Sequence, residues 1–129
     1  MRRIAAIVAV LAAAAALGAQ TARLAPPGEI FKTGERALQL IESTRVAAPE
    51  LGRAAEPVAQ NARQAYENLR AAGPQNGPLL YALLTNVRAY LALADALGVP
   101  AGLSDEARRQ FQELRDAQER MAVYFRALL

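Results

Sequence analysis

Residues that commonly perform chemistry in proteins are sparse in this chain of 129 residues, which contains neither cysteine nor histidine. Their absence removes disulfides, thiol nucleophiles, the usual zinc sites and proton transfer by imidazole. Two carboxylate pairs, Asp105/Glu106 and Glu113/Asp116, are better explained as helix-capping and ion-pairing groups. The sequence also lacks a glycine-rich phosphate loop and a G-x-S-x-G motif. We therefore predict that the protein is not an enzyme and uses no metal or cofactor.

Four polar residues interrupt residues 78–97, the most apolar stretch outside the N-terminus: Thr85, Asn86, Arg88 and Asp95. Steps of three and seven residues place Thr85, Arg88 and Asp95 on one side of a helix. They could line a ligand-binding slot between helices, or they could face water while the methylene groups of Arg88 cover the core. Burying unpaired charge is costly, which favours the arrangement that faces water.

Aromatic residues lie on or near the apolar faces of the expected helices. Core packing with hydroxyl groups at the rim explains them, and a pocket for a hydrophobic ligand would use the same residue types. Met121 alone is thin support for a haem site. The candidate interaction or pocket residues are Tyr81, Arg88, Tyr90, Asp95, Phe111, Met121 and Phe125.

A helix over residues 78–97 must hold a central position. Its apolar residues recur at alternating steps of four and three, which keeps them on one face: Leu80, Leu84, Val87, Leu91 and Ala94. Leu83, Tyr90 and Leu97 widen that face beyond a narrow stripe. Neighbouring helices must therefore cover this helix on most sides.

The segments before it predict two more helices. Residues 29–47 form a first amphipathic helix, expected to begin near Thr33 or Gly34 and to end before Pro49. Residues 49–72 hold a regular pattern of small apolar residues, with a kink or break near 54–57 caused by Pro57. These small residues would let a partner helix approach closely.

After the turn at residues 98–102, Ser104 is expected to cap a last helix, with Asp105 and Glu106 in its first turn. Its apolar pattern runs to Leu128, and pairs of opposite charge four residues apart, such as Arg115 and Glu119, are expected on its outer face. Three main helices joined by short turns, with the shorter first helix as a fourth member, predict an all-α, up-down helical bundle over residues 29–129.

The N-terminus is typical of a bacterial signal peptide over residues 1–22, in which Arg2 and Arg3 precede the uncharged apolar run 4–17. Cleavage could follow residue 18, 19 or 22, and residues 23–28 would form a linker. A run of about 14 residues is short for a membrane span of about 20, so an uncleaved anchor is the less favoured alternative. We predict a periplasmic or secreted protein that meets a membrane only if residues 1–22 are retained.

Charge does not predict nucleic-acid binding. The chain has 15 basic and 12 acidic residues, and removing Arg2 and Arg3 leaves 13 against 12, a net charge of +1. Both signs are interspersed, without a basic stripe. We expect a protein-interaction or chaperone-like module that binds a protein partner or itself, through the faces at residues 55–72 or 121–129. The alternatives are a bundle that binds a small hydrophobic ligand or lipid, and a membrane-anchored helical protein.

The start of the last helix resembles one family. Residues 103–107, Leu-Ser-Asp-Glu-Ala, are similar to helix starts in small periplasmic stress chaperones of the Spy and CpxP type, which carry a Leu-Thr-x-x-Gln motif. Ser104 replaces the threonine, Ala107 replaces the glutamine, and the sequence holds no second copy. The resemblance covers only this helix start and does not assign the chain to that family.

Overall fold

The computed structural model describes residues 27–129, and every regular element in that range is helical. The predicted all-α bundle is thereby confirmed, while the predicted signal peptide lies outside the described residues. The elements are α2 (Pro27–Ala47), α3 (Pro49–Ala54), α4 (Glu56–Ala72), α5 (Gly77–Ala96), the 3-10 helix η1 (Pro100–Gly102) and α6 (Asp105–Ala127).

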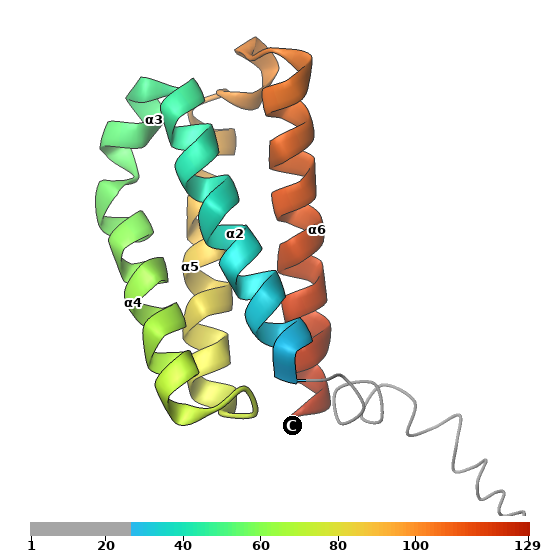
Figure 1. Ribbon diagram of the computed structural model, residues 1–129. Helices are drawn as coiled ribbons and strands as arrows, with labels where there is room; N and C mark the ends of the chain where they lie inside the picture. The colour runs from blue at the N-terminus through green and yellow to red at the C-terminus, as the bar shows by residue number, and fades with distance from the viewer. Residues whose placement is uncertain (1–26) are drawn as a thin grey trace, which may run out of the picture.

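Four long helices, α2, α4, α5 and α6, run alternately up and down (Figure 1). Helices α2 and α5 each pack against both α4 and α6, so the four form a closed ring around one core. One end of the bundle contains the start of α2, the α4–α5 turn and the end of α6, and we call it the C-terminal end. The opposite end contains α3 and η1 and is called the α3 end.

The first helix differs from its prediction. Helix α2 has 21 residues and begins at Pro27, so the expectation of a shorter helix that begins near Thr33 or Gly34 is wrong. Two of the six positions assigned to the linker 23–28 are helical. Proline is favoured in the first turn of a helix, and buried Ile30 attaches that turn to the core. The Thr33 hydroxyl donates to the Glu29 carbonyl oxygen at 2.8 Å, as expected inside a helix.

Most of the predicted helix boundaries are confirmed. Helix α2 ends two residues before Pro49, and the chain breaks between α3 and α4 at Ala55. The Asn76 side chain accepts a hydrogen bond from the Leu79 amide at 3.0 Å and caps α5. Ser104 caps α6 in the same way, accepting from the Ala107 amide at 3.2 Å. These caps satisfy amide groups that would otherwise lack partners.

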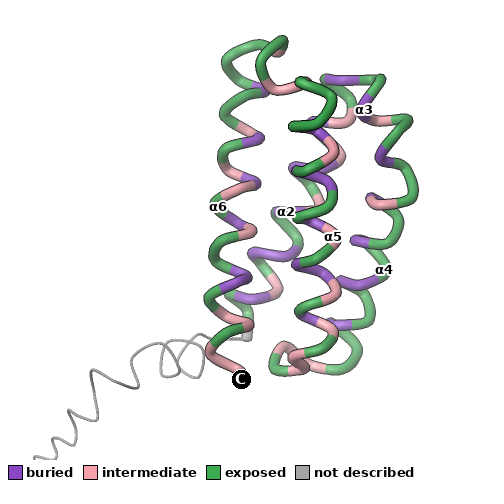
Figure 2. Tube along the Cα trace, turned by 180° about the vertical axis from the view of Figure 1, so that it is seen from behind, coloured by how far each residue is buried: buried purple, intermediate pink, exposed green. Residues whose placement is uncertain are grey.

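The small-residue face of α4 packs inside the bundle. Three of its alanines, at positions 59, 62 and 65, are buried, as is Ala55 just before it, and α4 and α5 are in extensive contact. In Figure 2 the buried segments of all four long helices turn toward the interior. Small side chains let two helix backbones approach closely. The prediction that residues 55–72 offer a free interaction surface is therefore wrong, because α5 already occupies this face.

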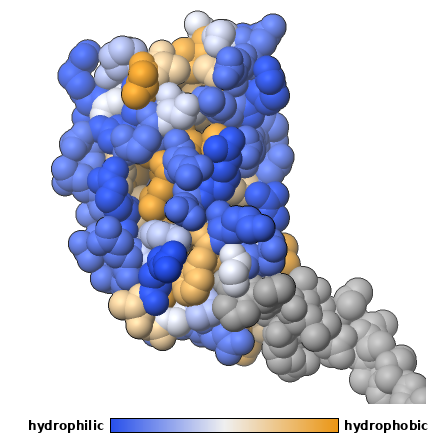
Figure 3. Space-filling view, viewed as in Figure 1, coloured by the Kyte–Doolittle hydropathy of each residue, from blue (hydrophilic) through white to orange (hydrophobic). Residues whose placement is uncertain are grey.

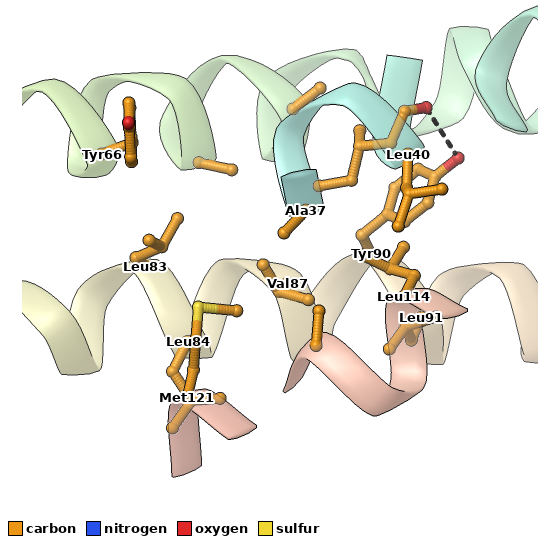
Figure 4. Packing of buried hydrophobic residues seen from close by; sticks show 14 of the residues in the cluster. Ala37, Leu40, Tyr66, Leu83, Leu84, Val87, Tyr90, Leu91, Leu114 and Met121 are labelled. Atoms are coloured by element: carbon orange, nitrogen blue, oxygen red, sulfur yellow. Dashed lines mark hydrogen bonds between the residues drawn. The ribbon is translucent and has the colours of Figure 1, made fainter. Parts of the chain in front are cut away.

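One polar contact lies in the centre of the core. Tyr90 of α5 and Thr44 of α2 are both fully buried, and their hydroxyl oxygens are 2.6 Å apart. The Tyr90 hydroxyl also donates to the Ile41 carbonyl oxygen at 3.3 Å, as Figure 4 shows. Burial raises the pKa of Tyr90 to about 12. Both hydroxyls thus have partners in an apolar surrounding, as buried polar groups require.

Some ion pairs join different helices, and others, such as Arg108 with Asp105 in α6, lie within one helix. Arg36 of α2 contacts Glu113 of α6 through both carboxylate oxygens, at 2.7 and 3.0 Å. Arg115 of α6 contacts Asp95 of α5 at 2.8 Å. The expected pairing of Arg115 with Glu119 is not what the structure shows, because a neighbouring helix offers Arg115 a closer carboxylate.

The Arg36–Glu113 pair predicts a small dependence of stability on acid. Hydrogen bonding from Arg36 holds the pKa of Glu113 below its ordinary value. The contribution of the pair is therefore present above the unfolded pKa, about 4.3, and is lost as pH falls through the lower folded pKa. Urea unfolding at pH 7 and pH 3 should show Glu113→Gln less stable than the native chain at pH 7, with a smaller difference at pH 3. An equal difference at both pH values would contradict the assignment.

Candidate functional site

The seven candidate residues divide into two groups. Tyr90, Phe111 and Met121 are fully buried and belong to the core. The remaining four reach the surface, and all four lie where α5 and α6 run side by side: Tyr81, Arg88, Asp95 and Phe125. The structure therefore separates residues with a packing role from residues that are available for binding.

The buried group does not line a common pocket with Tyr81. Tyr90 and Phe111 stack with ring centroids 6.3 Å apart and nearly parallel planes. Tyr81 is 46% exposed and precedes Tyr90 by nine residues, about 13 Å along the helix axis. Packing and hydrogen bonding already engage Tyr90 and Phe111, and the alternative of a hydrophobic-ligand pocket stays a prediction.

A surface groove runs between α5 and α6. Its volume is about 560 Å³, and its lining combines an apolar floor with charges of both signs. The lining residues are Arg88, Leu91, Ala92, Asp95, Gln112, Arg115, Asp116, Gln118 and Glu119. Two of the seven predicted residues, Arg88 and Asp95, are thus brought together in one site.

Some charged side chains of the groove have ion-pair or hydrogen-bond partners, and Arg88 has none among the described residues. Asp95 is paired with Arg115, and the Asp116 carboxylate accepts a hydrogen bond from the side-chain amide of Gln112 at 3.1 Å. Arg88 is exposed and makes no hydrogen bond or ion pair within residues 28–129. The predicted exposure of the polar stripe is confirmed, since Thr85, Arg88 and Asp95 all face water. Arg88 therefore presents an unpaired guanidinium beside an apolar floor.

An aromatic pair lies beyond the groove toward the C-terminal end. The Tyr81 and Phe125 rings are 4.9 Å apart and tilted by 38°. Phe125 is half-buried against the core while Tyr81 is exposed. Together the groove and this pair give the α5–α6 face polar and apolar contacts along its length.

Sequence reasoning missed the contribution of α6 to the groove. Arg115 and Gln118 line it, and the half-buried Phe125 follows at helical spacing on the same side of α6. The steps from 115 to 118 and from 118 to 125, three and seven residues, were a usable signal. On sequence alone, Arg115 is expected only in a surface ion pair within its own helix.

Residues 28–129 hold no cluster of three or more acidic side chains that could bind a metal ion. Among the helices from α2 to α6, none combines the length and the apolar character that a bilayer-spanning segment needs.

Comparisons with protein-family models, with curated proteins and with solved structures find no match to this chain. The geometry of the α5–α6 face is therefore the basis for the functional proposal.

Proposed function

We propose that this protein is an exported, non-enzymatic interaction module whose α5–α6 groove accepts a helix of a partner protein. The observation that carries the proposal is the unpaired, exposed Arg88 beside the apolar floor of Leu91 and Ala92. An unsatisfied charge next to apolar surface gives a partner both an ionic and a hydrophobic contact.

The shape of the face favours a helix as the occupant. Two antiparallel neighbours leave a groove between them that follows their axes. Exposed residues of α5 recur at alternating steps of four and three from Tyr81 to Asp95, a length of about 21 Å. Recognition of a helix in a groove uses this spacing on the partner as well.

Charge defines what the partner helix should carry. Arg88 would pair with a carboxylate, and Glu119, which has no ion pair within residues 28–129, would pair with a lysine or arginine. The floor at Leu91 and Ala92 calls for small or aliphatic residues between those charges. We therefore expect an amphipathic partner helix rather than a wholly apolar segment of an unfolded client.

The face of the bundle around α2 supports the choice of the α5–α6 groove as the binding surface. Figure 3 shows the side on which α2 lies in front, and its surface is mostly hydrophilic with hydrophobic residues confined to small areas. Contiguous exposed apolar patches are the usual sign of a surface that binds unfolded chains. The face shown in Figure 3 thus gives little support to general chaperone-like binding, and the proposal assigns binding to the α5–α6 groove.

Site-specific photo-crosslinking in the producing cells tests the proposal. A photoreactive residue at Ala92 or Gln118 should crosslink to the same partner protein, while one at Asn61 or Gln64 on the exposed side of α4 should not. Crosslinks to a second copy of this chain would mean that the protein is its own partner. Equal crosslinking from α4 would show that the groove is not the binding surface.

Affinity for the purified partner provides the quantitative test. Arg88→Glu should weaken binding by about tenfold or more, because it replaces an attraction by a repulsion. Arg53→Glu is the matched control, since Arg53 is also exposed and makes no ion pair with a described residue. Equal affinities of the two variants would refute the role of Arg88.

Export itself is tested by the mass of the mature protein. We propose that residues 1–22 act as a signal peptide, as their charge and hydropathy favour. The protein from the exported fraction should then lack its first 18, 19 or 22 residues. A full-length mass in the membrane fraction would instead establish an uncleaved anchor.

A further inference from the structure

Two contacts set the register between α5 and α6. The Tyr81 and Phe125 rings meet toward the C-terminal end, and Asp95 meets Arg115 toward the α3 end. The two helices run in opposite directions, so the midpoint between these contacts lies at position 88 of α5 and position 120 of α6. Arg88 on one wall of the groove therefore stands level with the carboxylate at position 119 on the other wall.

Charges of opposite sign alternate over this face. At one level Arg88 of α5 lies across the groove from Glu119 of α6, and neither makes an ion pair within residues 28–129. At the other level the signs are reversed, with Asp95 on α5 and Arg115 on α6. When such a face is turned over about an axis along the groove, each charge on α5 meets the opposite charge on α6. The face is thus complementary in charge to itself.

We propose that the partner of the α5–α6 groove is a second copy of this chain, packed face to face about a two-fold axis that runs along the groove. The inference rests on the proposed function and deepens it, because it identifies the partner helices as α5 and α6 of an identical chain. Arg88 of each copy meets Glu119 of the other, so a single symmetry operation supplies both unpaired charges with partners. The Asp95–Arg115 pairs of the two copies meet at the next level as a cluster of alternating sign.

The cost of covering the groove favours this occupant. Any partner that closes over the groove removes water from Arg88 and Glu119, and a desolvated charge without a counter-charge is strongly unfavourable. The second copy carries a carboxylate and a guanidinium at the positions where they are needed. Turning the face over about an axis across the groove would instead bring Arg88 against Asp95, which Arg115 already engages. The axis along the groove therefore makes better use of the unpaired charges.

The size of the face suits a reversible dimer. Helix α5 has 20 residues and is about 30 Å long, and two neighbouring helices together are about 20 Å wide. A contact over the whole face would bury on the order of 1,200 Å² over both copies, which is the lower end for specific protein interfaces. The small side chain of Ala92 on the floor of the groove lets the second copy approach closely. We therefore expect a dimer that dissociates on dilution.

Charge reversal combined with mixing tests the partner and its orientation together. Sedimentation equilibrium measures the dimer dissociation constant of the protein recovered from the exported fraction. Arg88→Glu and Glu119→Arg should each raise this constant by about tenfold or more, because the two-fold axis turns one substitution into two repulsive contacts. An equimolar mixture of the two variants should form a mixed dimer about as tightly as the native chain, since both contacts are attractive again between unlike chains. Native mass spectrometry identifies the mixed dimer by its mass.

Arg53→Glu and Glu67→Arg are the matched controls. Both residues are exposed, lie outside the groove and make no ion pair with a described residue. Their variants, alone or mixed, should leave the dissociation constant unchanged. Recovery of affinity in the mixture of groove variants would also show that the single variants are folded. A monomer at every concentration, a mixture that does not recover, or an equal effect of the controls would overturn the inference.

Photo-crosslinking from Ala92 separates the failure of this inference from the failure of the proposed function. Crosslinks to a different protein, together with a monomeric chain, would overturn the second copy as partner and leave the groove as the binding surface. A dimer that is insensitive to both groove variants, with no crosslink from Ala92 or Gln118, would show that another face is used and would overturn both proposals.

Discussion

Tyr90→Ala is expected to lower the free energy of unfolding by about 3–5 kcal/mol, the range for truncating a large aromatic side chain in a core. Tyr90 is fully buried, stacks on Phe111 and holds hydrogen bonds to Thr44 and the Ile41 carbonyl oxygen. The substitution removes the ring contacts, leaves a cavity and takes away a partner of the Thr44 hydroxyl. Urea unfolding monitored by circular dichroism at pH 7 measures the change.

Two variants calibrate this result. Tyr90→Phe keeps the ring and removes only the hydroxyl, so it should cost about 1 kcal/mol. Tyr81→Ala removes the same side chain from the same helix where it is 46% exposed, and its cost should fall well below that of Tyr90→Ala. Equal destabilisation by the two alanine variants would mean that Tyr90 does not lie in the core as described.

Gly34→Leu is the second large expected effect, a loss of about 3 kcal/mol or more through overpacking. A Cβ atom at Gly34 would lie 2.9 Å from Cδ1 of Tyr66 and 3.1 Å from Cδ2 of Leu83. Both neighbours are buried, so α2 would have to move away from α4 and α5 to admit a side chain. Thermal unfolding at neutral pH should show a clear drop in midpoint.

Gly28→Leu is the matched control for this substitution. Gly28 lies in the same helix, and a Cβ atom there would meet no heavy atom within 4 Å. Leucine has a higher helix propensity than glycine, so stability should be unchanged or slightly higher. A comparable loss in both variants would place the cause in α2 itself rather than in its packing at Gly34.

Periodicity predicted most of the fold because it reflects burial directly. The apolar spacing of residues 78–97 placed α5 within one residue of both observed ends, Gly77 and Ala96. The start of α2 was misjudged because Gly34 was interpreted as a helix boundary. Glycine at that position instead allows Tyr66 to approach the α2 backbone, a tertiary contact that a single segment does not reveal.

The candidate site was predictable only in part, for a similar reason. Composition and spacing identify aromatic and charged residues on helix faces but do not say which face meets which neighbour. Tyr81 and Tyr90 are alike in sequence, yet nine residues of helix place one at the surface and the other in the core. The groove depends on the pairing of α5 with α6, and the residues that α6 contributes become visible only once that pairing is known.

The buried contact between Thr44 and Tyr90 also decides how the helices line up. Layers of leucine and alanine resemble one another, so sliding α5 along α2 by seven residues, about 10 Å, would restore much of the apolar packing. The same slide would leave the Tyr90 hydroxyl in a dry interior without these partners, at a cost of about 1–3 kcal/mol, while the Thr44 hydroxyl would keep its bond to the Leu40 carbonyl oxygen. One hydrogen bond thus selects a single alignment among several of similar hydrophobic content. Its main value is to make the native arrangement unique rather than to make it strong.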